Sequence, residues 1–187
     1  MVPSKDARTL LWFQMEKEEV MAIDLYGDVY VDNWDYARKI VTLGYSKPFY
    51  RINSFVTPNR ECSISFHEED VNFIHPKYSE IDCPGLYAIY EKTINNVSCL
   101  YTGGSNYSMR QRVYRFVKEL HGVSRHDEDH PGARKARRAG VNPNNLLVKF
   151  FPKSEFPKVE NLVVNFETLD ETVAIMLKSR FNTRKKA

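Results

Sequence analysis

The sequence predicts an α+β protein in two parts: a small N-terminal α+β extension over residues 1–82 and a main domain over residues 83–187. A chain of 187 residues with 42% hydrophobic and 27% charged side chains suits about one globular domain with a small addition. A polar connector, residues 67–82, marks the boundary. Beyond it, patterns of three strands and three helices follow one another, which is typical of an α+β domain.

The N-terminal extension contains strand and helix signals but no chemical motif. Apolar spacing predicts an amphipathic helix over residues 5–21. A second helix is expected to begin at Asp32 or Asn33, which can cap it, and to end at Gly44. Strands are predicted at residues 21–25, 29–31, 49–56 and 62–66, in two pairs that each surround a turn sequence.

A hairpin opens the main domain and carries two tyrosines. From Gly85 onward, apolar or aromatic residues occupy both alternating positions, which is typical of a strand in the centre of a sheet. Asn95-Asn96 suits a tight turn, and a strand over residues 97–102 returns beside the first. The hairpin therefore sets Tyr87 and Tyr101 on neighbouring strands.

A helix rich in arginine follows the hairpin. Ser108 and Gln111 have the spacing of a capping box. Apolar residues then recur at helical spacing and form the stripe Met109, Val113, Phe116, Val117 and Leu120. Arg110 and Arg112 lie at the margins of this stripe, and Arg115 lies further round the helix. An arginine at the margin can reach the sheet edge where the tyrosines lie, which is the geometry that a phosphate site requires.

The last part of the chain adds a second basic helix, a strand and a final helix. Pro131 is expected to start the basic helix and Gly140 to end it. Its cations are Arg134, Lys135, Arg137 and Arg138. Such a cluster suits a helix that lies on a phosphate backbone. An apolar strand is predicted at residues 146–151, as the third strand of the sheet, and the final helix at residues 169–181, before a basic tail.

The charge is divided unevenly between the two parts. Residues 1–82 hold 9 Lys or Arg and 14 Asp or Glu, a net charge of −5, whereas residues 83–187 hold the remaining 18 and 10, a net charge of +8. The basic part favours a polyanion such as nucleic acid as partner, and a solvated basic surface is the alternative. No apolar run is long enough to span a membrane and the polar start lacks a secretory pattern, so no membrane association and a cytoplasmic location are expected.

Four short motifs, in this order and on these elements, resemble those of the GIY-YIG nuclease family. Gly85-Leu86-Tyr87 stands where the family has GIY, and Tyr101-Thr102-Gly103 stands where it has YIG. The spacing Met109-x-x-Arg112-Val113 resembles the pattern of its first helix. The residues that resemble the family's ending are Glu171, Ile175 and Asn182. The resemblance covers about residues 83–182.

The resemblance implies a GIY-YIG-like domain with a three-stranded antiparallel sheet flanked by helices. It also implies that this domain hydrolyses phosphodiester bonds of DNA with one Mg²⁺ or Mn²⁺ ion per active site. In the implied roles, Tyr87 activates or positions water, and Tyr101 hydrogen-bonds to the reacting phosphate. Arg112 stabilises the pentavalent phosphate, and Glu171 holds the metal ion as the single carboxylate of a one-metal site. The basic residues expected to contact nucleic acid are Arg110, Arg115, Arg134, Lys135, Arg137 and Arg138.

Two of these assignments have competitors in the sequence. Arg110 competes with Arg112, although the apolar residues that frame Arg112 favour the latter. Glu167 competes with Glu171, because Thr168 and Glu171 also have the spacing of a capping box.

One departure from the family pattern leaves two functions open. Phe116 stands four residues after Arg112, where the family generally has His or Tyr, and Tyr114 or His130 is the candidate replacement. The first function is a metal-dependent DNA endonuclease of the restriction, homing or repair type. The second is a catalytically impaired nucleic-acid-binding module on the same fold. Residues 1–82 are the candidates for substrate selection, partner binding or contacts in a homodimer.

Overall fold

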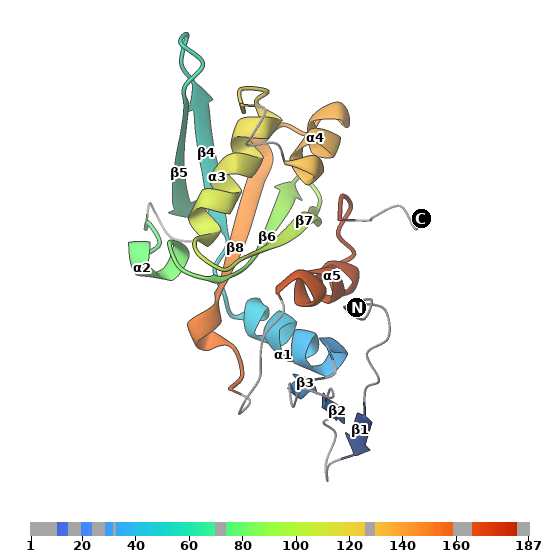
Figure 1. The fold of residues 1–187 in the computed structure, drawn as a ribbon. Coiled ribbons are helices and arrows are strands. Elements are labelled where there is room, and N and C mark those ends of the chain that lie inside the picture. The colour runs from blue at the N-terminus through green and yellow to red at the C-terminus, as the bar shows by residue number, and fades with distance from the viewer. Residues whose placement is uncertain are drawn as a thin grey trace, which may run out of the picture.

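The fold is built on a five-stranded antiparallel sheet with the strand order β5-β4-β8-β6-β7 (Figure 1). The computed structural model describes residues 11–14, 20–23, 29–31, 33–69, 74–125, 130–158 and 166–182. The strands of this sheet are β4 (Tyr50–Val56), β5 (Cys62–Glu68), β6 (Gly85–Lys92), β7 (Val97–Ser105) and β8 (Leu146–Pro152). The helices are α1 (Asn33–Tyr45), α2 (Tyr78–Ile81), α3 (Met109–Leu120), α4 (Pro131–Arg138) and α5 (Phe166–Met176), with 3₁₀ turns at Pro143–Asn145 and Lys153–Glu155. Within these ranges, no helix combines the length and the apolar character that crossing a membrane requires.

Three strands of the sheet are those predicted for the main domain, and two are additional. β6 pairs with β7 on one side and with β8 on the other. β8 also pairs with β4, through Tyr50 opposite Val148 and Arg51 opposite Leu147, so the sheet has five strands rather than three. Every residue of β8 is buried, and a buried strand needs hydrogen-bonding neighbours at both edges. The strands on the two sides of the predicted boundary at residues 67–82 therefore share one sheet.

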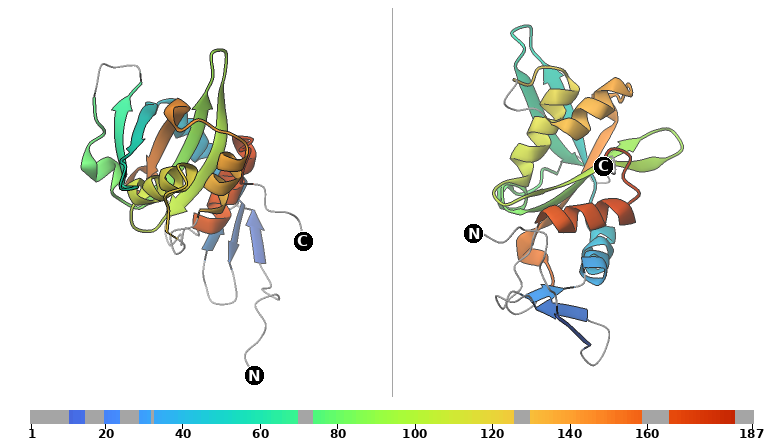
Figure 2. Two further views of the ribbon diagram at one scale, coloured as in Figure 1. Left: turned by 90° about the horizontal axis from the view of Figure 1, so that it is seen from above. Right: turned by 45° about the vertical axis from the view of Figure 1, so that its right-hand side comes forward.

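Helices cover both faces of the sheet, and an apolar core lies on each side. In Figure 2, α3 and α4 lie on one side of β6 and β7, and α1 and α5 lie on the other. The first core includes Tyr87, Val113 and Phe116, and the second includes Leu86 and Leu169. Leu86 and Tyr87 are neighbours in β6 and belong to opposite cores, as side-chain alternation along a strand requires. Tyr87 thus lies on the side that the arginine-rich helix covers.

The two basic helices begin and end at the residues that the sequence indicated. The Ser108 hydroxyl accepts a hydrogen bond from the Gln111 backbone N–H at 3.1 Å and caps α3. The five residues of its predicted apolar stripe are all buried, which confirms the helix phase. α4 begins at Pro131, and Gly140 just after its end has a φ of +74°, which glycine adopts without strain.

The predictions for the extension are confirmed for its helix α1 and for the β4–β5 hairpin, but the helix at residues 5–21 is wrong. β1 (Leu11–Gln14) and β2 (Val20–Ile23) are strands and pair with each other. With β3 (Val29–Val31), which pairs with β2 as predicted, they form a separate three-stranded sheet. Pairing with the following strand decides such short apolar stretches, and the apolar spacing within one of them does not reveal it. The turn predicted at residues 26–28 lies outside the described residues.

Helix α1 does not end at Gly44 as predicted. It includes Gly44 and continues to Tyr45. A Cβ at Gly44 would lie 2.5 Å from the ring of Phe151. The glycine therefore allows close packing of the helix on β8, and it is not a helix-ending residue.

The final helix is shifted toward the N-terminus relative to residues 169–181. α5 begins at Phe166 and ends at Met176, and Lys178 has a φ of +52° where the chain turns back. The backbone N–H groups of Arg180 and Phe181 then donate to carbonyl groups of β7. The segment after α5 thereby hydrogen-bonds to backbone carbonyl groups at the outer edge of β7. The predicted basic tail lies outside the described residues.

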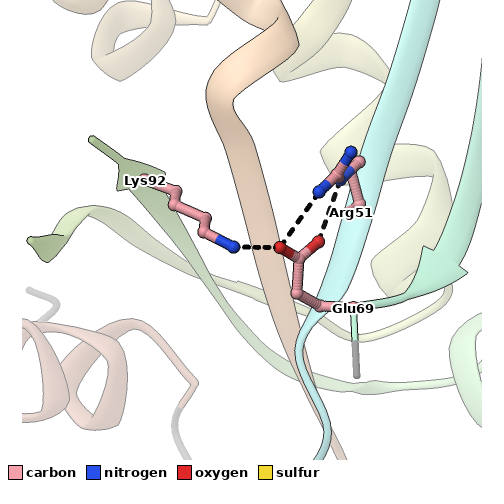
Figure 3. Close-up of polar contacts among 3 residues, drawn as sticks. All are labelled: Arg51, Glu69 and Lys92. Atoms are coloured by element: carbon pink, nitrogen blue, oxygen red, sulfur yellow. Dashed lines mark hydrogen bonds and ion pairs between the residues drawn. The ribbon is translucent and has the colours of Figure 1, made fainter. Parts of the chain in front are cut away.

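A largely buried carboxylate ties the β4–β5 hairpin to the end of β6 (Figure 3). The Glu69 side chain is only 9% exposed. The Arg51 guanidinium donates to it twice, at 2.9 and 3.1 Å, and the Lys92 ammonium donates to it as well. The hydrogen bond from Arg51 is the largest of the effects that lower the pKa of Glu69. Because β8 lies between β4 and β6, this network joins the added hairpin to the predicted sheet.

Candidate active site

Tyr87 and Tyr101 lie together on β6 and β7, as the hairpin predicted. Their ring centroids are 6.3 Å apart. Tyr87 is paired in register with Gly103, and a Cβ at Gly103 would lie 2.3 Å from the Tyr87 hydroxyl oxygen. Only a residue without a side chain lets the phenol pass across β7 at this point. Gly103 therefore determines where the Tyr87 hydroxyl lies.

The Tyr87 side chain is only 2% exposed, and its hydroxyl stays protonated at neutral pH. Burial raises the pKa of Tyr87 well above its ordinary value, Tyr101 and Asp170 raise it further, and the Arg112 guanidinium opposes them. A protonated phenol can hold a water molecule or donate to an oxygen, whereas an ionised phenol would be needed to remove a proton. Of the two implied roles, this environment favours positioning over activation of water.

Arg112 and Arg110 have different surroundings, and these separate the two candidates. The charge of Arg112 acts on both Tyr87 and His130, so its guanidinium lies within electrostatic reach of the tyrosine cluster. Arg110 pairs with Asp82 at 3.6 Å, and its guanidinium lies 4.7 Å from the centre of the Tyr78 ring. Arg110 thus binds the segment around α2, and Arg112 is the arginine of the candidate site.

A carboxylate that the sequence analysis did not single out, Asp170, reaches the site from α5. Its Oδ1 accepts a hydrogen bond of 2.6 Å from the Thr102 hydroxyl, and its charge acts on Tyr87. Thr102 is a buried hydroxyl on a sheet strand, and such a group needs a partner. A threonine on a central strand signals in the sequence that some polar residue must face it. The sequence does not show that this residue is Asp170.

Glu171 follows Asp170 in α5 and its side chain is exposed. Thr168 lies inside α5, because the helix begins at Phe166, so the alternative of a capping box between Thr168 and Glu171 is wrong. The side chain of Glu167 lies outside the described residues. Of the two adjacent carboxylates of α5, Asp170 is the one whose hydrogen bond to Thr102 places it beside β7.

Asn182 clamps the end of the chain to β7 beside the tyrosines. Its Oδ1 accepts from the Thr102 N–H at 2.7 Å, and its Nδ2 donates to the Thr102 carbonyl at 2.8 Å. The Ser179 hydroxyl also donates to Asn182 Oδ1. The amide side chain thus satisfies an otherwise unpaired backbone between Tyr101 and Gly103. This gives a structural reason for an asparagine at that place in the motif.

His130 and Phe116 complete the surroundings of Tyr101. The centroid of the Tyr101 ring lies 4.9 Å from that of His130 and 5.6 Å from that of Phe116. Tyr114 lies elsewhere, since its hydroxyl donates to the carbonyl of Cys62 on β5. Tyr114 and His130 are the two candidates to replace the His or Tyr that Phe116 displaces. Of these two, His130 is the one whose ring packs on Tyr101.

The six residues predicted to contact nucleic acid divide into two groups. Two hold the protein together: Arg110 as described, and Arg137, which pairs at 3.3 Å with the buried Glu119 of α3. The side chains that remain at or near the surface are Arg115, Arg134, Lys135 and Arg138. Arg115 also acts on His130, so the basic surface extends from the site across α3 toward α4.

The candidate site offers few oxygen ligands to a hard cation. Mg²⁺ and Mn²⁺ prefer carboxylate and water oxygens, and α5 carries Asp170 and Glu171, which as consecutive helix residues do not face each other. Among the described residues, no cluster of three or more His, Cys, Asp or Glu side chains could hold a metal. A site with few protein ligands, completed by water and a substrate phosphate, is the arrangement that these residues permit.

Comparison with known proteins adds no relative to this geometry. Neither protein-family models, curated proteins nor solved structures gave a match. The assignment of a function therefore depends on the side chains that the fold brings together.

Proposed function

We propose that the protein is a metal-dependent endonuclease that hydrolyses phosphodiester bonds of DNA. One observation carries the proposal: Tyr87 and Tyr101 lie side by side on β6 and β7, and Arg112 of α3 and Asp170 of α5 both lie within electrostatic reach of Tyr87. Tyr87 and Tyr101 supply hydroxyl groups, Arg112 supplies a cation and Asp170 supplies a carboxylate. These are the groups that hydrolysis of a phosphodiester requires.

The reaction adds one water molecule to the phosphodiester. The water oxygen bonds to phosphorus, the bond from phosphorus to one sugar oxygen breaks, and a water proton ends on that leaving oxygen. In this scheme the Tyr87 hydroxyl orients the water and the Tyr101 hydroxyl donates to a phosphate oxygen. Arg112 offsets the negative charge that the phosphate gains in the transition state.

Asp170 takes the role that the resemblance gave to Glu171. It accepts from Thr102 and acts on Tyr87, whereas Glu171 is exposed on the next position of α5. When bound, a Mg²⁺ or Mn²⁺ ion supplies positive charge to the nonbridging oxygens and makes a bound water more acidic. Asp170 would hold that ion, and water and a substrate phosphate would complete its ligands.

DNA is the substrate class that the charge distribution supports. The cations at the surface of α3 and α4 extend from the tyrosine cluster, and phosphate contacts by such side chains give most of the affinity for a nucleic-acid backbone. A basic helix that carries Lys135 and Arg138 at its surface would position the duplex beside Arg112.

The second candidate function is a nucleic-acid-binding module that does not cleave. Two observations favour it: Tyr87 is only 2% exposed, and the side chain of Phe116 cannot exchange a proton. In this case the basic surface would bind DNA and the tyrosine cluster would serve as core.

Incubation of supercoiled plasmid with Mg²⁺, with Mn²⁺ and with EDTA separates the two functions. The endonuclease proposal expects metal-dependent nicking that Asp170→Asn reduces by roughly 100-fold or more, while Glu171→Gln, its isosteric neighbour, has a much smaller effect. Titration of both variants with Mn²⁺ gives a second readout, and weaker binding is expected for Asp170→Asn. If the protein binds DNA but nicks it under none of these conditions, the endonuclease proposal is wrong and the binding module remains. Sequencing of the ends would distinguish restriction, homing and repair types.

A further inference from the structure

We propose that His130 is a further catalytic residue, which donates a hydrogen bond from Nε2 to an oxygen of the reacting phosphate. The inference rests on the proposed function. It assigns to His130 the polar contact that Phe116 cannot make at the position where the resemblance expects His or Tyr.

The position of the ring is the first reason. The His130 side chain is 6% exposed and meets the ring of Tyr101 edge-on, with centroids 4.9 Å apart and an interplanar angle of 79°. It meets Phe116 in the same way, at 5.2 Å and 74°. The three rings contact one another, so the imidazole lies against both Phe116 of α3, where the missing group was expected, and the tyrosine that is proposed to contact phosphate.

The hydrogen bond at Nδ1 is the second reason. His130 is the N-cap of α4, and its Nδ1 accepts from the Ala133 N–H at 3.4 Å. A neutral imidazole that accepts at Nδ1 carries its proton on Nε2, and in that tautomer Nε2 is a donor. The cap thus holds the ring in place, and the proposal assigns it this tautomer.

The charges around the ring favour the neutral form. Burial and then the Arg112 guanidinium lower the pKa of His130 to about 4, and Arg115 adds to the effect. A neutral imidazole can stabilise developing negative charge through its N–H without transferring the proton. The same two arginines that lower the pKa are those proposed to attract phosphate, which places His130 on the side of the site where charge would develop.

A purely structural role as helix cap is the competing explanation, and two substitutions separate the roles. In His130→Asn, the amide oxygen replaces Nδ1 as a cap, and the Nε2 donor is lost. In His130→Gln, the longer side chain carries an N–H near the position of Nε2, and the cap is weakened. The pair therefore exchanges the two functions of the imidazole.

Plasmid nicking with Mg²⁺, DNA affinity measured without nicking, and thermal unfolding form the test. We expect His130→Asn to lose roughly 100-fold in nicking rate with unchanged DNA affinity and with a melting temperature no lower than that of His130→Gln. We expect His130→Gln to remain within about tenfold of the parent rate. The reverse pattern, with full nicking by His130→Asn, would overturn the inference.

The outcome is distinguishable from failure of the proposed function. If the parent protein nicks DNA and Asp170→Asn does not, the endonuclease stands whatever the His130 variants do. If the parent protein binds DNA without nicking it, both the endonuclease and the role of His130 fall together.

Discussion

At the scale of single residues, the site depends on one close approach. The Tyr87 hydroxyl crosses β7 over Gly103, where a Cβ would lie 2.3 Å from the oxygen. The same phenol is buried and its pKa is raised, so its hydroxyl acts as a fixed donor. Gly103 and Tyr87 are thus in direct steric contact, and a larger residue at position 103 would displace the Tyr87 hydroxyl oxygen.

Two substitutions test this arrangement. Gly103→Ala is expected to displace the Tyr87 ring, with overpacking that costs about 1–3 kcal/mol of the free energy of unfolding and a large loss of nicking. Tyr87→Phe removes only the hydroxyl, so nicking should fall while chemical denaturation shows little loss of stability. Full nicking by Tyr87→Phe would show that the ring is core and that its hydroxyl has no part in the reaction.

Local sequence patterns point to some residues of the candidate site and not to others. Tyr87, Tyr101 and Arg112 follow from short motifs on elements that local patterns predict well. Asp170 was not singled out, because it and Glu171 are adjacent acids and only the contact of Asp170 with Thr102, which the fold supplies, distinguishes them. His130 was named only as an alternative, since its contact with Tyr101 requires α4 to pack against the β6–β7 hairpin.

At the scale of elements, local chemistry fixed the helices and distant pairing fixed the sheet. α3 was predicted through its apolar stripe and its Ser108 cap, and α4 through Pro131 and Gly140. β8 gave no sign of which strand would pair with its second edge, because a fully apolar strand is compatible with any neighbour. The strand β1 was mistaken for a helix for the same reason: its pairing with β2 is not encoded in its own residues.

The basic helix α4 has two kinds of arginine, and they should respond differently. Arg138 is exposed, so Arg138→Gln is expected to weaken DNA binding and to reduce the slope of log affinity against log salt by about 0.9. Arg137 pairs with the buried Glu119, so Arg137→Gln should cost about 1–3 kcal/mol of stability by removing the partner of a buried carboxylate. Fluorescence anisotropy across a salt series and thermal unfolding measure the two effects. If Arg138→Gln and Arg137→Gln changed the slope of log affinity against log salt equally, the assignment of different roles to the two arginines would be wrong.

The junction between β4, β5 and β6 should make stability depend on pH. The pKa of Glu69 is lowered from its ordinary value of 4.5, chiefly by the hydrogen bond from Arg51. A lowered folded-state pKa gives stability that is complete above the ordinary value and is lost as the pH falls through the folded value. Glu69→Gln should therefore reduce stability at pH 7 by about 1 kcal/mol, because its cationic partners are half exposed, and the difference from the parent should shrink below pH 4.5. Urea unfolding at pH 7 and pH 3.5 measures it, and a constant difference would rule out the linkage.

At the scale of the whole molecule, the first 82 residues contribute strands to two different sheets. Their β4–β5 hairpin is part of the sheet that carries Tyr87 and Tyr101, and α1 covers the second core, whereas β1, β2 and β3 form a separate sheet beyond α1 (Figure 1). Of the first 82 residues, the three-stranded sheet is therefore the part that could select substrate or bind a partner without contributing to the sheet that carries Tyr87 and Tyr101.

Two truncations test where the catalytic fold begins. Removal of residues 1–32 takes away β1, β2 and β3 and leaves both faces of the five-stranded sheet covered, so soluble protein with metal-dependent nicking is expected. Removal of residues 1–82 also deletes β4, β5 and α1, which exposes one edge of the fully buried strand β8 and uncovers the second core. An exposed apolar edge of this kind favours aggregation, so the shorter protein is expected to be insoluble or unfolded. Circular dichroism, size-exclusion chromatography and the plasmid assay compare the two. A folded and active protein lacking residues 1–82 would show that three strands suffice, and that the hairpin β4–β5 serves recognition and is not required for folding.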